Sequence, residues 1–132
     1  MALSKRRTPV DRAYAYVDSP LMTHRVHYGR QLAARIQGNH GIYYARVQLG
    51  RGIENQCSCP SDWRPCKHVR ALRLTWEENP DSFFDLQNFL TQFSTRSKAA
   101  LLEAIANMAM RAPEGLGALG VAQFAEEEVE WQ

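Results

Sequence analysis

Hydrophobic and polar positions alternate along residues 30–37 and again along residues 42–49. Side chains with a period of two lie on opposite faces of a β-strand, so each segment predicts a strand with one apolar face. The sequence Gly38-Asn39-His40-Gly41 separates the two segments and is typical of a hairpin turn. A second glycine turn, at residues 50–52, leads into a third expected strand at residues 53–57. The pattern therefore predicts a three-stranded antiparallel meander whose polar face carries Arg35 and Arg46.

Further along the chain, the apolar spacing changes to that of helices. Val69, Leu72 and Trp76 recur at helical spacing, and Asn79-Pro80 is expected to end this first helix. A second helix is expected to begin at Asp81 or Ser82, and a third, capped by Ser94-Thr95, is expected over residues 96–111. The apolar residues expected to face inward are Phe83, Leu86, Phe89, Leu90 and Phe93 in the second helix and Leu101, Leu102, Ile105, Met108 and Ala109 in the third.

The two ends of the chain have weaker patterns. Residues 14–17 alternate briefly and predict a strand or an extended segment, and the glycines of residues 113–120 favour a linker. Residues 121–132 are either a frayed acidic tail or a segment that binds a partner or the basic part of this chain. We expect a basic N-terminal extension at 1–28, a zinc-binding module at 29–79, a helical extension at 80–112, and a linker with an acidic tail at 113–132.

All three cysteines of the chain fall within twelve residues, in the spacing C-x-C-x6-C-x-H formed by Cys57, Cys59, Cys66 and His68. Three thiolates and one imidazole are a ligand set of closed, tetrahedral structural zinc sites. Residues i and i+2 of a strand point to the same side, so the first two cysteines can reach one ion from a strand end. On a helix the same spacing separates side chains by roughly 200°. We therefore expect Cys66 just before a helix and His68 in its first turn, with one Zn²⁺ per chain.

Two other chemistries use clustered cysteines. A disulfide between Cys57 and Cys59 would be strained by the single intervening residue, and clustered cysteines of cytosolic proteins more often bind metal. The CDGSH-type proteins hold a [2Fe–2S] cluster with three cysteines and one histidine, and they also open with C-x-C. Their histidine follows the third cysteine by four positions, whereas His68 follows Cys66 by two. This comparison favours zinc.

The segment from Cys57 to His68, continued by Val69-Arg70-Ala71-Leu72, resembles the SWIM zinc-finger family. That family is marked by C-x-C, a variable spacer and C-x-H, often in the form CxCP…PCKH followed by an apolar helix. Cys59-Pro60 and Pro65-Cys66-Lys67-His68 match this fuller form, and the preceding meander is similar to the strands of bacterial members. The resemblance covers residues 29–76 and implies a non-catalytic module that binds DNA or protein. It predicts an α+β fold in which the meander leads into a zinc knuckle and helix, followed by two or more packed helices.

Composition and charge exclude several classes of protein. The 132 residues are 45% hydrophobic and 23% charged, which is ordinary for a globular domain. Neither a membrane-spanning run nor a signal-peptide pattern occurs, so we expect a cytoplasmic protein, or a nucleoid or nuclear one if it binds DNA. The sequence has no Ser-His-Asp order, phosphate-binding glycine loop or HExxH motif, so we expect no enzyme and no small-molecule substrate.

Two functions remain open. The formal net charge of +2 conceals a division: residues 1–80 hold 13 lysines and arginines against 6 acidic residues, and residues 81–132 hold 3 against 8. The basic part favours binding to nucleic acid, DNA rather than RNA, as an accessory subunit of a DNA-processing assembly. The acidic part and the helices favour instead a protein–protein interaction adaptor in which zinc is only structural. The residues expected to contact nucleic acid are Arg35, Arg46, Arg51, Trp63, Arg64, Lys67, Arg70 and Arg73.

The basic residues near the cysteines also have a second expected use. Three thiolates and a neutral imidazole give a zinc site a net charge of about −1. Arg64, Lys67 and Arg70 can offset that charge whether or not a partner is bound.

Overall fold

The structure is a computed structural model that describes residues 13–50, 56–60 and 66–125. The chain divides into two compact units, Met1–Phe89 and Leu90–Gln132. The first unit contains a mixed sheet and the candidate metal ligands, and the second is helical. The fold class is α+β, as the sequence predicts.

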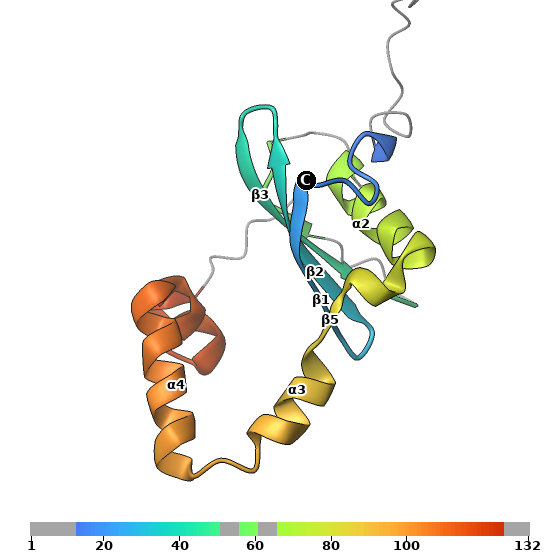
Figure 1. Cartoon of the computed structure of the whole chain (residues 1–132). Helices are drawn as coiled ribbons and strands as arrows, with labels where there is room; N and C mark the ends of the chain where they lie inside the picture. The colour runs from blue at the N-terminus through green and yellow to red at the C-terminus, as the bar shows by residue number, and fades with distance from the viewer. Residues whose placement is uncertain (1–12, 51–55, 61–65, 126–132) are drawn as a thin grey trace, which may run out of the picture. The chain divides into compact units, whose positions relative to one another are not determined.

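The sheet of the first unit has five strands in the order β4-β3-β2-β1-β5. Neighbouring strands from β4 to β1 are antiparallel, and β5 pairs with β1 in parallel (Figure 1). The strands are β1 (Met22–Tyr28), β2 (Gln31–Gly38), β3 (Gly41–Gln48), β4 (Gln56–Cys57) and β5 (Phe84–Asp85). The predicted meander is thus β2-β3-β4; residues 51–55, which include most of its expected third strand, lie outside the described residues.

The hairpin β2-β3 confirms the alternation read from the sequence. Its register runs without interruption from Gln31↔Gln48 to Gly38↔Gly41, around the predicted turn. The buried residues of the two strands all lie on one face of the sheet: Leu32, Ala34 and Ile36 in β2, and Ala45 and Val47 in β3. The other face, which carries Arg35, Tyr44 and Arg46, is called the open face below.

Helix α2 (Lys67–Glu78) covers the apolar face of the sheet (Figure 1). Its buried residues are His68, Val69, Ala71, Leu72 and Thr75. Trp76 continues this stripe and meets Phe83 edge to face, with ring centroids 5.2 Å apart. The helix ends at Glu78 before Pro80, as predicted.

Strands β1 and β5 are not among the predicted strands. Residues 14–17, expected as strand or extended chain, instead form a short helical piece and turns, since Ala13 and Tyr14 are helical. The register of β1 shifts between Thr23 and Val26, and His24 adopts a positive φ of 54° there. Such a bulge breaks the period of two by which a strand is recognised, and a strand as short as β5 has too few residues to show a period.

The Arg25 side chain of β1 hydrogen-bonds both to Asp18, which precedes the strand, and to Ser82, which follows α2. Its guanidinium donates to Asp18 at 2.6 Å and to the Ser82 hydroxyl at 2.8 Å. The Asp18 backbone N–H donates to the buried Thr75 hydroxyl at 2.9 Å. The hydrogen bonds from Arg25 and Asn79 lower the pKa of Asp18, so the carboxylate stays charged in this arrangement over the physiological pH range.

The later helices begin at caps other than those predicted. Helix α3 (Leu86–Phe93) begins after β5, where the Asp85 carboxylate accepts the Asn88 N–H at 3.0 Å. Asp81 and Ser82, the two residues expected to start this helix, lie instead in the 3₁₀ turn Pro80–Ser82. Helix α4 (Lys98–Arg111) is capped by Ser97, which accepts the Ala100 N–H, instead of by Ser94 or Thr95.

The expected linker is also structured. Residues Pro113–Leu119 form the 3₁₀ turn η2 and Ala122–Phe124 form η3. The two turns pack closely: a Cβ added at Gly117 would lie 2.2 Å from the Phe124 carbonyl oxygen. The glycine there permits a close approach of two backbones.

The predicted apolar face of α4 is wrong for three of its residues. Leu102, Ile105 and Met108 have exposed fractions of 55%, 42% and 71%. Leu101 and Ala109 are half-buried, and none of the described residues from 90 to 125 is fully buried. The helical unit thus leaves a large part of its apolar surface uncovered by the described chain.

A side chain at position 38 is predicted to disturb the packing of the Tyr43 ring beside the candidate metal ligands. A Cβ at this position would lie 2.5 Å from Cε2 of Tyr43, whose ring packs against His68. Gly38→Ala should therefore force the ring out of place and lower the free energy of unfolding by about 1–3 kcal/mol, measured by denaturant titration. Gly115→Ala is the matched control because a Cβ there meets nothing within 4 Å. Equal stability of the two variants would contradict this account.

Candidate metal centre

The four predicted ligands come from two elements that meet at one end of the sheet. Cys57 is the last residue of β4, and Cys59 follows two positions later. Cys66 is the residue that precedes α2, and His68 lies in the first turn of that helix, as the spacing predicts. Strand β4 is placed by its pairing with β3, where Ala45 lies opposite Cys57. The sheet edge and the helix start thereby bring together side chains up to eleven residues apart.

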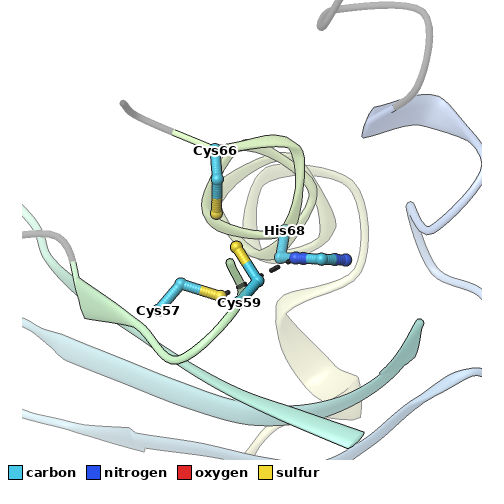
Figure 2. Close-up of side chains that lie close together, drawn as sticks. All are labelled: Cys57, Cys59, Cys66 and His68. Atoms are coloured by element: carbon cyan, nitrogen blue, oxygen red, sulfur yellow. Dashed lines mark hydrogen bonds between the residues drawn. The ribbon is translucent and has the colours of Figure 1, made fainter. Parts of the chain in front are cut away.

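The ligand atoms are close enough to share one ion. The three sulfurs and one His68 nitrogen all lie within 4.8 Å of one another, and Figure 2 shows the cysteine side chains converging beside the histidine ring. The Cys57 sulfur lies 3.7 Å from His68 Nδ1. A tetrahedral zinc with bonds of about 2.3 Å to sulfur and about 2.0–2.1 Å to nitrogen would hold two such atoms about 3.6 Å apart. The donor set fits a four-coordinate metal.

The burial of the four residues and the free state of the three cysteines are consistent with metal binding. Cys57, Cys59, Cys66 and His68 are 6%, 4%, 0% and 2% exposed, and none of the cysteines forms a disulfide. The hydrogen bond from Cys57 lowers the pKa of Cys66, and the same contact together with burial raises the pKa of Cys57. The thiolate is the form of cysteine that binds metals, and the lowered pKa of Cys66 agrees with its use as a ligand.

Two tyrosine rings set the orientation of His68. The Tyr16 ring meets the imidazole edge to face at 5.0 Å between centroids, and the Tyr43 ring lies at 5.2 Å. These contacts leave Nδ1 as the nitrogen nearest a sulfur. The other nitrogen, Nε2, is buried and has no hydrogen-bond partner among the described residues. Coordination through Nδ1 would place the ring proton on Nε2.

Ser58, which lies between two of the candidate ligands, is hydrogen-bonded to Tyr44 of β3 in a way that the ligand spacing alone does not reveal. Its backbone N–H donates to the Tyr44 carbonyl at 3.1 Å, and its hydroxyl accepts the Tyr44 N–H at 2.9 Å. These two bonds continue the β3-β4 pairing beyond the two residues of β4. The chain between Cys57 and Cys59 is thus attached directly to Tyr44, which lies on the open face with 64% of its surface exposed.

The residues expected to contact nucleic acid separate into two groups. Arg35 and Arg46 lie on the open face of the sheet, on β2 and β3. Lys67, Arg70 and Arg73 lie on α2, which covers the opposite face. Arg51, Trp63 and Arg64 lie outside the described residues. The described basic residues therefore do not form a single surface. A count of net charge alone would have suggested that they do.

The open face has further polar groups near Arg46. Gln56, the register partner of Arg46 on β4, accepts a hydrogen bond from the Arg46 guanidinium. The two residues line a hollow of about 210 Å³. Its other lining residues are Gln31, Val47 and Gln48. These glutamines are dispersed in the sequence and gather only through the strand register, so no motif could have indicated them.

No known protein family, no curated protein and no solved structure matches this chain. The resemblance to the SWIM family therefore rests on the sequence of residues 29–76, from the strands that lead into Cys57 to the helix that follows His68. In the described part of the chain, no helix has both the length and the apolar character needed to cross a membrane.

Loss of any one ligand is predicted to abolish tight metal binding. Cys59→Ser and His68→Ala should each reduce the bound metal from one ion per chain to well below one, because a closed site then lacks a quarter of its donors. Elemental analysis of the purified variants measures this content directly. His40→Ala removes an exposed imidazole in the hairpin turn and is the matched control. Full metal content in both ligand variants would refute the assignment.

Proposed function

We propose that the chain is a non-catalytic zinc-binding module that binds DNA as an accessory subunit of a DNA-processing assembly. The first step of the proposal is the identity of the metal. Three thiolates and one imidazole in close range suit the borderline-soft Zn²⁺, and carboxylate-preferring ions such as Mg²⁺ and Ca²⁺ are disfavoured by this donor set. The C-x-H spacing at Cys66 and His68 favours zinc over a [2Fe–2S] cluster.

The proposed zinc is structural. Four protein donors fill a tetrahedral shell, so no position remains for a water or substrate. The ligands are also buried, which keeps substrates away from the ion. Its role is to hold β4 and the start of α2 together. Structural zinc is worth on the order of 10 kcal/mol in small zinc-finger peptides.

The observation that carries the DNA-binding proposal is the charge pattern of the open face. Arg35 lies directly opposite Tyr44, and Arg46 lies two residues from Tyr44 on the same strand. No described residue whose side chain lies on this face of β1 to β5 is acidic. Arg46 is exposed and Arg35 is half-buried. Arginines that reach solvent attract phosphates and release counterions when they bind them. The face is therefore suited to a polyanion.

The basic residues of α2 have a local use that competes with DNA binding. Lys67 precedes His68 directly, and its ammonium lies 5.5 Å from the centre of the Tyr16 ring, which packs on His68. A zinc site with three thiolates has a net charge of about −1, which nearby cations stabilise. We therefore assign the phosphate contacts primarily to the open face.

The proposal predicts which arginines set the salt dependence of binding. Replacing Arg35 and Arg46 by glutamine should weaken DNA binding and reduce the slope of log Kd against log salt by about 1.5, since each lost phosphate contact removes about 0.7–0.9. Fluorescence anisotropy with labelled oligonucleotides at several salt concentrations measures the slope. Lys98→Gln with Arg111→Gln, a pair on α4, controls for net charge. A larger effect from Arg70→Gln with Arg73→Gln would place the contacts on α2 instead.

A protein–protein adaptor is the second candidate, favoured by the uncovered apolar surface of the helical unit. Leu102, Met108 and Met110 are 55%, 71% and 83% exposed, and no described residue of that unit is fully buried. Exposed methionines are adaptable contact residues in protein interfaces. This candidate is supported if the purified chain binds no nucleic acid while a defined protein co-purifies with it and is lost from a Leu102→Ser, Met108→Ser variant.

A further inference from the structure

The open face combines an exposed aromatic ring with arginines on either side of it. Tyr44 is 64% exposed, and its cross-strand partner is Arg35. Directly opposite residues have Cβ atoms about 4.5–5.5 Å apart, and diagonal neighbours such as Arg35 and Arg46 lie about 7–8 Å apart. Long guanidinium side chains at these distances can reach the phosphates on both sides of a base that lies on the ring.

The strand register places a second aromatic group on the same face. Val26 pairs with both Ala33 and Phe84, so the Phe84 side chain lies on the open side of the sheet. Phe84 is 52% exposed and meets Phe89 at 5.6 Å between ring centroids. Since Ala33 is the register partner of Arg46, one row of the sheet contains Arg46, Ala33, Val26 and Phe84. Three strand spacings of about 4.8 Å separate its ends by about 14 Å.

We propose that this face binds single-stranded DNA, with Tyr44 stacking on an unpaired base, Arg35 and Arg46 contacting the adjacent phosphates and Phe84 forming a second stacking position. The inference rests on the proposed DNA binding and specifies its substrate. Aromatic residues on a sheet stack on bases only when those bases are not already stacked in a duplex. A duplex presents its phosphates and groove edges, which a ring lying on a sheet does not read.

The neighbourhood of Tyr44 favours a preformed platform. Ser58 bonds to both the N–H and the carbonyl of Tyr44, so the strand position of the ring is fixed from the metal-binding segment. The Gln56 side-chain oxygen accepts a hydrogen bond from the Arg46 guanidinium and restrains that side chain. Groups that are already ordered lose less conformational entropy on binding. The amides of Gln31, Gln48 and Gln56 around the hollow offer donors and acceptors to base edges.

The test compares single-stranded and duplex DNA with Tyr44 variants of the full chain loaded with zinc. The single-stranded probe is an oligothymidine of about 12 nucleotides. The proposal expects the native chain to bind this probe more tightly than a duplex of equal length. Tyr44→Ala should weaken single-strand binding by about 5- to 150-fold, the loss of one stacked base, while Tyr44→Phe should stay within about twofold of the native chain. Phe84→Ala should cause a smaller loss on the same probe.

Tyr14→Ala is the matched control because Tyr14 is also exposed, at 57%, but is not part of the sheet. Its affinity should equal that of the native chain. Zinc content and thermal unfolding of each variant show whether a loss of binding reflects a loss of structure.

Four outcomes would overturn the inference. Equal or tighter binding of duplex DNA would leave DNA binding intact and refute the single-strand platform. An equal loss in Tyr44→Phe and Tyr44→Ala would show that the hydroxyl matters and stacking does not. Tighter binding of an oligouridine than of the oligothymidine would assign the face to RNA. In the fourth outcome, Tyr44→Ala has no effect on binding of the oligothymidine, while removal of residues 126–132 strengthens that binding by more than about tenfold. This result would make the acidic tail the occupant of the face. Absence of binding to every nucleic acid tested would instead refute the proposed function itself.

Discussion

The meeting of β4 with the first turn of α2 is the contact on which this end of the fold depends. Strand β4 consists of two residues, and its ladder pairing with β3 involves only Ala45 and Arg46. A strand of that length has little stability of its own. Helix α2 has twelve residues, near the lower limit for an isolated helix, and is held mainly by its apolar stripe. Four side chains sharing one metal would join these two weak elements at a single point.

The rest of the first unit has a different source of stability. Strands β2 and β3 pair over their full length, and Leu32, Ile36, Val47 and Leu72 are fully buried between the sheet and α2. This core does not require the metal for its hydrophobic contacts. Metal loss would therefore act first on β4, and from there on the Ser58 bonds to Tyr44. The open face and the metal site are physically connected through this one strand edge.

The sequence was most informative where a single local rule applied. The ligand spacing predicted which cysteine follows a strand and which precedes a helix, and the alternation around Gly38 predicted the faces of β2 and β3. Strand β1 escaped prediction because its bulge at His24 shifts the side-chain period within seven residues. The faces of α4 were mispredicted because apolar spacing indicates a helix but not whether the chain itself covers that helix.

The candidate site was also predictable from the sequence only where its residues lie close together in the chain. Its metal ligands are contiguous enough in the sequence to be recognised by type and spacing. The open face is assembled from β1, β2, β3, β4 and β5, so its residues become neighbours only through register. Charge counting also merged two groups of cations that the sheet separates: Arg35 and Arg46 on one side, and the basic residues of α2 on the other. Summed charge is a property of composition, whereas a binding surface depends on which face each side chain occupies.

The composition of the open face is difficult to explain by solubility alone. Single exposed aromatic residues are common on protein surfaces and require no special explanation. A surface that serves only solubility mixes both signs of charge and keeps large apolar side chains few. Here Tyr44 lies directly opposite Arg35, Phe84 lies in the same row as Arg46, and the described residues of the face include no acid to neutralise the arginines. A polyanion with exposed flat rings supplies both missing components, since its phosphates neutralise the arginines and its bases cover the aromatic side chains.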